Sequence, residues 1–310
     1  MTSLLLNALV PVWFVILIGY VAGRYRLIPH EAIRSFSTVV IDFALPCTLF
    51  VGVFDFRPAQ FENVAYIVTL ATTFVVPFVA GVAIAVRYFR QRLPEASLFA
   101  CNCGFPDMAF FGLPVIIVVV GPKGLLPVIV GNILTSILII PPVMAMLHHS
   151  GAKEDPGFSI GEVVVRTFRR PIVWAPIVAF VLALAGFQIP ALATASLKLI
   201  GGITGGLALL TLGLMLSELT PRFDKEAAII SVLKNFVAPA IVVVAAKLLH
   251  LPRDLAVGAV IIAACPSATI AAMLSSQFAV ARDKVPGQIL ASNLVAFASM
   301  PLWILIAEKL

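Results

Sequence analysis

Residues 96–121 read ASLFACNCGFPDMAFFGLPVIIVVVG, an apolar stretch long enough to cross a membrane but crowded with helix-breaking and polar residues. Those near its middle are Asn102, Gly104, Pro106, Asp107, Gly112 and Pro114. Proline removes a backbone hydrogen bond and clashes with the preceding turn, and glycine weakens the helix further. Non-helical backbone at membrane depth is tolerated only where protein buries it or where it lines a watery cavity. The stretch therefore predicts a helix that unwinds halfway.

A second stretch, residues 255–280, reads LAVGAVIIAACPSATIAAMLSSQFAV and carries Pro266, Ser267 and Thr269 at its centre. An ordinary proline kink explains either stretch taken alone. The two occupy matching places in the two halves of the chain, and corresponding interruptions favour a binding site. Half-helix amino termini present free N–H groups and a positive dipole end, so an anionic carboxylate would suit such a site.

The composition excludes a water-soluble fold. The 310 residues are 61% hydrophobic and 12% charged, whereas soluble domains carry about 25% charged residues. The net charge is +6, and the basic residues lie singly or in small groups between apolar runs. This pattern is typical of signals for membrane topology and not of a surface that binds nucleic acid. The four cysteines fall inside apolar runs, so we expect free packing thiols and neither a disulfide framework nor a metal site.

Apolar runs bounded by charge, proline or glycine predict ten membrane spans, so the fold class is an all-α integral membrane protein. The spans are 4–23, 33–54, 64–86, 96–120, 125–147, 171–188, 192–216, 227–249, 255–281 and 287–307. Fourteen of the 21 Lys and Arg residues lie in connections or at span ends on one side, five lie in such places on the other side, and two lie further inside spans. Because basic residues favour the cytoplasmic side, both termini are predicted outside, in the periplasm.

The hydrophilic connector 148–170 divides the chain into a first five-helix repeat, 1–147, and a second, 171–310. An odd number of spans in each half forces opposite orientations, as in the inverted repeats of many secondary transporters. The connector is either an amphipathic helix on the membrane surface or a solvated link on the cytoplasmic side.

Ionisable side chains within the spans are the candidates for ion coupling. An ionised carboxylate such as Asp107 or Asp42 at this depth costs about 2.5–3.5 kcal/mol and marks a relay or substrate path. One interpretation is that either acid takes up a proton when substrate binds. The alternatives are coupling to sodium, or a neutral acid whose hydrogen bonds serve packing alone. Lys198 and Lys234 lie closer to span ends, and we expect them to snorkel to an interface. The alternative for Lys198 is a buried cation that balances Asp42 or a substrate carboxylate. The run GGITGG at 201–206 and Gly213 predict close helix contacts.

The pattern FPDMAFFGLP at 105–114 resembles the fourth-span signature of the auxin efflux carrier family, which includes plant auxin exporters and bacterial carriers described as malonate or malate transporters. Four further segments resemble family segments in the family's order: PVWFVILIGYVAGRYRLI at 11–28, IDFALPCTLF at 41–50, GGLALLTLGLML at 205–216 and CPSATIAAML at 265–274. Family members commonly have Asn where Asp107 stands. Either this carboxyl is protonated when substrate binds, or the cargo differs.

The resemblance implies crossing broken helices four and nine around the substrate. It also implies an elevator-like movement of a transport domain, spans 3–5 and 8–10, against a scaffold of spans 1, 2, 6 and 7, and in many members a homodimer. The residues expected to bind substrate are Asn102, Pro106, Asp107, Gly112, Pro114, Asn132, Pro266, Ser267, Thr269 and Asn293. Asp107 is the first candidate for ion coupling and Asp42 the second.

The predicted function is that of a secondary carrier in the inner membrane for small organic anions, such as malonate or malate. Its expected partners are the anion, H⁺ or Na⁺ and the lipid bilayer, with no nucleic acid and no cofactor. A channel-like pore, or a carrier for an auxin-like aromatic acid, is the alternative. A membrane-embedded enzyme is disfavoured because His30, His148, His149 and His250 all fall in connections, without metal-ligand spacing or a paired acid and base.

Overall fold

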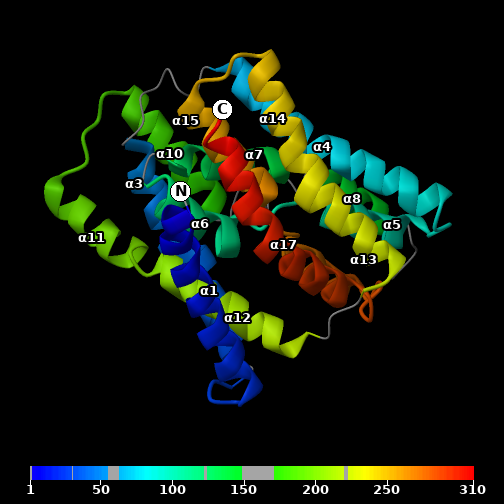
Figure 1. Ribbon diagram of the computed structural model, residues 1–310. Helices are drawn as coiled ribbons and strands as arrows, with labels where there is room; N and C mark the ends of the chain where they lie inside the picture. The colour runs from blue at the N-terminus through cyan, green and yellow to red at the C-terminus, as the bar shows by residue number, and fades with distance from the viewer. Residues whose placement is uncertain (1, 30, 55–62, 122–123, 149–170, 220–222) are drawn as a thin grey trace. The chain divides into compact units, whose positions relative to one another are not determined.

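The computed structural model describes residues 2–29, 31–54, 63–121, 124–148, 171–219 and 223–310, and every regular element named within them is a helix (Figure 1). The connector 148–170 lies outside these residues, apart from His148, where α8 ends. Neither the amphipathic helix nor the solvated link expected there can therefore be described.

The helices of the first half follow the predicted spans. They are α1 (Thr2–Arg24), α2 (Glu31–Thr38), the π-helix η1 (Val39–Ala44), α3 (Leu45–Phe54), α4 (Val64–Arg87), α5 (Leu93–Gly104), the π-helix η3 (Met108–Gly112), α6 (Leu113–Val119), α7 (Leu125–Leu138) and α8 (Ile140–His148). Those of the second half are α10 (Pro171–Leu184), α11 (Ala191–Gly201), α12 (Thr204–Glu218), α13 (Lys225–Val232), the π-helix η5 (Leu233–Val237), α14 (Ala238–Leu248), α15 (Arg253–Ala264), α16 (Ile270–Phe278) and α17 (Val285–Ala307).

Six continuous helical stretches among the described residues are long and apolar enough to cross a membrane. They are Glu31–Phe54, Val64–Arg87, Leu125–Leu147, Ala191–Glu218, Lys225–Leu248 and Val285–Ala307. The other four predicted spans coincide with α1, with α10 and with the interrupted helices α5–α6 and α15–α16. The all-helical membrane class is confirmed.

Contacts divide the chain into two compact units, each built from separate segments. Unit 1 comprises residues 1–64, 109–129 and 168–218, and unit 2 comprises residues 65–108, 130–167 and 219–310. The break after α5 therefore coincides with a change of unit in the middle of the fourth span.

Unit 1 is held together by close packing of α1 on α12, which lie side by side (Figure 1). A Cβ atom on Gly213 would fall 2.1 Å from the Ile16 carbonyl oxygen, and one on Gly19 would fall 2.2 Å from the Leu210 oxygen. The predicted close contact at Gly213 is confirmed. In the run 201–206 the prediction holds for Gly201, which approaches Thr48, and is wrong for Gly205 and Gly206, which face open space.

Unit 2 packs α15 and α17 side by side, with α13, α14 and α5 against them. Its apolar core includes a cluster of Ala85, Ala96, Phe99, Cys103 and Ile230, which joins α4, α5 and α13. All four cysteines of the chain are free, as predicted. The cluster includes Cys103, the residue before Gly104, where α5 ends.

Candidate functional site

The first interruption begins where α5 ends at Gly104. Phe105 adopts an extended backbone with φ −103° and ψ 107°, as the following Pro106 requires. Helical geometry returns only at Met108, in η3. Gly104 also permits α4 to approach, because a Cβ atom there would lie 2.7 Å from the Phe74 carbonyl oxygen. The local sequence thus ends α5 at the place where its neighbour packs most tightly.

The second interruption has the same local cause. α15 ends at Ala264, and Cys265, the residue before Pro266, is extended with φ −59° and ψ 145°. α16 begins at Ile270, after Thr269. The interruptions expected within 104–114 and 264–270 are therefore present, and both occur at a proline.

The two unwound segments pair with each other. Pro106 and Ser267 form an isolated antiparallel bridge. The Asp107 amide donates to the Pro266 carbonyl oxygen at 2.8 Å, and the Ala268 amide donates to the Phe105 oxygen at 3.1 Å. Each break thus satisfies backbone groups that the other leaves without an intrahelical partner, which is how irregular backbone can persist in an apolar interior. We call residues 105–107 and 265–268 the crossing.

Ser267 ties the crossing to the helices around it. Its hydroxyl donates to the Asn102 carbonyl oxygen at 2.7 Å, and its amide donates to the Ser292 hydroxyl at 3.1 Å. That hydroxyl donates in turn to Asn235 Oδ1 at 3.1 Å, and Asn235 Nδ2 donates to the Ser292 carbonyl oxygen at 2.8 Å. The crossing is therefore braced by α5, by α17 and by η5.

Four predicted polar residues of unit 2 are buried, Ser267 among them. Asp107 is 2% exposed, Asn102 is fully buried and Asn293 is 1% exposed. Asn102 Nδ2 donates to Gln288 Oε1 and Asn293 Nδ2 donates to the Ile289 carbonyl oxygen, whereas both amide oxygens make no hydrogen bond among the described residues. A buried acceptor without a donor is costly, so these oxygens suit an O–H or N–H group of a guest.

The other predicted residues lie in different surroundings. In unit 2, Pro266 is buried, while Thr269 and Asn132 are half-buried. Gly112, at the end of η3, and Pro114, in the first turn of α6, are buried within unit 1. Asp42 also belongs to unit 1, where it lies in η1 with an exposed side chain. Asp42 is therefore exposed, whereas Asp107 is buried.

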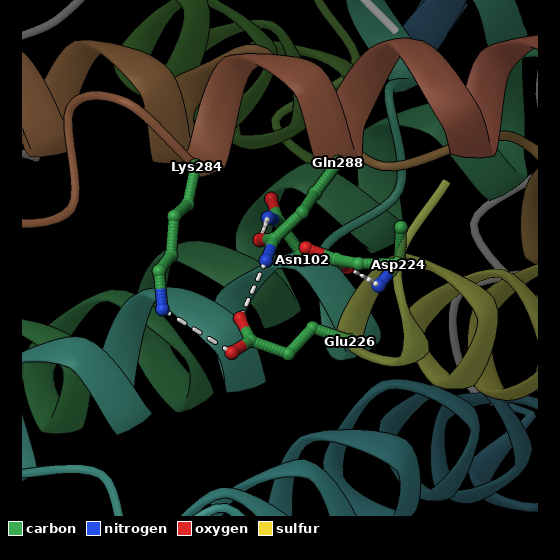
Figure 2. Close-up of polar contacts among 6 residues, drawn as sticks. Asn102, Asp224, Glu226, Lys284 and Gln288 are labelled. Atoms are coloured by element: carbon green, nitrogen blue, oxygen red, sulfur yellow. Dashed lines mark hydrogen bonds and ion pairs between the residues drawn. The ribbon is translucent and has the colours of Figure 1, made fainter. Parts of the chain in front are cut away.

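A polar network leads from Asn102 to the rim of unit 2 (Figure 2). Gln288 accepts from Asn102 at 3.3 Å and donates through Nε2 to Glu226 Oε2 at 2.8 Å. The ammonium of Lys284 pairs with Glu226 Oε1 at 3.4 Å. Glu226, Lys284 and Gln288 line part of a cavity of about 130 Å³, together with Gln91 and Glu95.

Reasoning from the sequence missed the roles of Lys234, Asn235 and Gln288. The expectation that Lys234 snorkels is wrong, because its side chain is 1% exposed and its Nζ donates to the Ala263 carbonyl oxygen at 2.8 Å. The signal available was the pair Lys-Asn at 234–235 inside an apolar run just before Pro239. That pair lies in a π-turn, a feature frequent at functional sites.

Comparison with known proteins places the chain among membrane transporters. The model of a family described as membrane transport protein matches residues 4–304. The chain is 26% identical over 317 aligned positions to the uncharacterized transporter YfdV of Escherichia coli K12, with 99% of each chain covered. It is 24% identical to an uncharacterized transporter of Methanothermobacter thermautotrophicus, with 93% of each covered.

A third relative carries a substrate in its name. The chain is 22% identical to a protein of Rhizobium meliloti named "Putative malonate transporter", with 94% of this chain and 92% of that protein covered. The family match over nearly the whole chain agrees with the five motifs read in the sequence. The chain therefore belongs to the membrane transport protein family, which is the auxin efflux carrier family indicated by its fourth-span motif.

Proposed function

We propose that this membrane transporter is a secondary carrier for small organic anions, mono- or dicarboxylates such as malonate, in the inner membrane. The observation that carries the proposal is the crossing, where α5 and α15 both end and the chain restarts at η3 and α16. A helix that restarts carries the positive end of its dipole in its first turn, which favours a carboxylate nearby. Asn102, Pro106, Asp107, Pro266, Ser267 and Thr269 lie at or beside the breaks, and the proposed site also includes Asn132, Gly112, Pro114 and Asn293.

The proposed movement is an elevator within ten spans arranged as two inverted repeats, with both termini outside. The division into two units supports a moving part that differs from a static part. Unit 2 contains the third, eighth, ninth and tenth spans and the first half of the fourth, whereas unit 1 contains the first, second, sixth and seventh. A proline-interrupted fourth span that belongs partly to each unit would act as the hinge. A homodimer built on the static part completes this proposal.

Asp107 is the proposed proton-coupling residue, and Asp42 is the second candidate. Asp107 lies in the crossing and is buried, where an ionised carboxylate beside an anionic substrate would be strongly disfavoured. Proton uptake by Asp107 on substrate binding removes that repulsion. Sodium coupling is the alternative that the same experiment separates.

The test is uptake of labelled malonate, malate, acetate and indole-3-acetate by proteoliposomes, each with and without a pH or sodium gradient. We expect saturable uptake of one or more of the aliphatic acids, driven by an inward proton gradient. Preference for indole-3-acetate would indicate an auxin-like cargo. Conductance that does not saturate would indicate a channel, and absence of all carboxylate transport would refute the proposal.

The variant D107N separates the proton role from binding. We expect it to retain exchange of labelled for unlabelled substrate but to lose acceleration by the pH gradient, because the amide cannot carry a proton. D42N, whose parent side chain is exposed on unit 1, is expected to keep that acceleration. If D107N responds to the gradient as the wild type does while D42N does not, the coupling role passes to Asp42.

A further inference from the structure

Lys234 is a buried cation that the mechanism above does not use. It lies in η5, in the middle of the helical stretch Lys225–Leu248, and is among the largest fully buried side chains of the described residues. Lysine near a span end can extend its ammonium to the interface at little cost. A charge in the interior of a membrane protein is energetically costly, and such a residue is expected to have a function. The inward position of Lys234 therefore calls for a role.

The hydrogen bond of Lys234 places its charge beside the crossing. Nζ donates to the Ala263 carbonyl oxygen at 2.8 Å, in the last turn of α15, and the chain leaves the helix two residues later. The carboxyl end of a helix carries the negative end of the dipole, which stabilises a cation. The ammonium is thus held at the end of a half-helix, directly before Pro266.

The ionisable groups facing η5 from neighbouring elements are few. The thiols of Cys103, in the last turn of α5, and Cys265, directly after α15, lie near Lys234. Cys265 also lies near Asp107, so one neutral thiol is close to both groups. α17 contains no ionisable side chain from Val285 to Ala307. In α13 and α14 the ionisable residues are Lys225, Glu226 and Lys247, near the outer ends of the two helices.

We propose that Lys234 is the fixed positive charge that balances the substrate in the moving part of the carrier. The proposal rests on the function proposed above and names the charge state carried. With Asp107 protonated, the ammonium and a substrate of charge −1 sum to zero; with substrate gone and Asp107 ionised, the ammonium and the carboxylate sum to zero. Both forms cross without carrying net charge through the bilayer, where such charge is expensive. The transported species is then a monocarboxylate or a singly protonated dicarboxylate.

The test measures exchange of labelled for unlabelled malonate in proteoliposomes, with and without an imposed membrane potential. Acetate replaces malonate if the uptake experiment above shows that acetate is preferred. Only the loaded carrier moves in exchange. We expect the wild type and K234R to exchange equally well at either potential. K234M should exchange at least tenfold more slowly and should respond to the potential severalfold, because its loaded form carries a charge of −1. K247M, which changes an exposed lysine of the same helical stretch, is the matched control and should behave as the wild type.

Several results overturn the inference. K234M that exchanges at the wild-type rate, or slowly without responding to the potential, shows that Lys234 only caps α15. K234Q provides the same comparison if K234M does not fold, as judged by its melting temperature in detergent. Wild-type exchange that itself responds to the potential refutes charge balance without any variant. A wild type that exchanges no carboxylate refutes instead the proposed function.

Discussion

Gln288 shows how one side chain can connect the rim of unit 2 to the crossing. Its Oε1 accepts from Asn102, and its Nε2 donates to Glu226. Asn102 in turn accepts from Ser267 through its backbone oxygen. Lys284, by contrast, touches the network only through a partly exposed ion pair with Glu226, and such pairs contribute about 0–1 kcal/mol.

For single residues, we predict that Q288L lowers the stability of the folded protein much more than K284Q does. The leucine leaves the buried Asn102 amide without the partner described here, which costs about 1–3 kcal/mol. Thermal unfolding in detergent should show a clear decrease in melting temperature for Q288L and little change for K284Q. Equal melting temperatures for the two variants would contradict the importance assigned to this network.

How closely two helices pack depends on which of their glycines face the neighbouring helix. α12 contains Gly205 and Gly213, but only Gly213 faces the backbone of α1, where a Cβ atom would overlap the Ile16 oxygen and lie 2.7 Å from the Tyr20 nitrogen. Small residues at such positions let membrane helices approach and pack. A Cβ at Gly205 would meet open space.

We therefore predict opposite effects for the same substitution in one helix. G213A should separate α1 from α12 and lower the melting temperature, at a cost of about 1–3 kcal/mol typical of overpacking. G205A should be neutral or slightly stabilising, because alanine loses less conformational entropy than glycine. The ratio of folded to aggregated protein after heating, measured by size-exclusion chromatography, checks both. Loss of folded G205A equal to that of G213A would contradict the packing described.

The orientation of the whole molecule is predicted from its basic residues, fourteen of which lie on one predicted side. A fluorescent protein that matures only in the cytoplasm, fused after Leu310, should stay dark, whereas alkaline phosphatase at the same position should be active. Fusions within the connector 148–170 should give the reverse pattern. A bright fusion after Leu310 would contradict the outward termini and the ten-span proposal with them.

Much of this architecture could be predicted from the chain alone, because its causes are local. An apolar composition favours insertion into lipid, and proline favours a break in a helix, since its ring removes a donor and restricts the preceding residue. Other prolines, such as Pro77 and Pro301, lie inside continuous helices. Pro106 and Pro266, in contrast, lie at the two breaks, and the extended residues before them are the direct result. The motif around Pro106 likewise indicates the family that the comparison confirms.

Packing alone decided which groups meet. The Ser267 hydroxyl and the Asn102 oxygen it contacts are 165 residues apart in the chain, and no local pattern encodes their pairing. Lys234 points inward and Asp42 lies exposed, because the direction of a side chain depends on the helices packed beside it. For the same reason Gly213 meets a neighbour and Gly205 does not. Composition and proline determined where the helices enter the membrane and break, and only tertiary contacts decided which partners satisfy the exposed peptide groups.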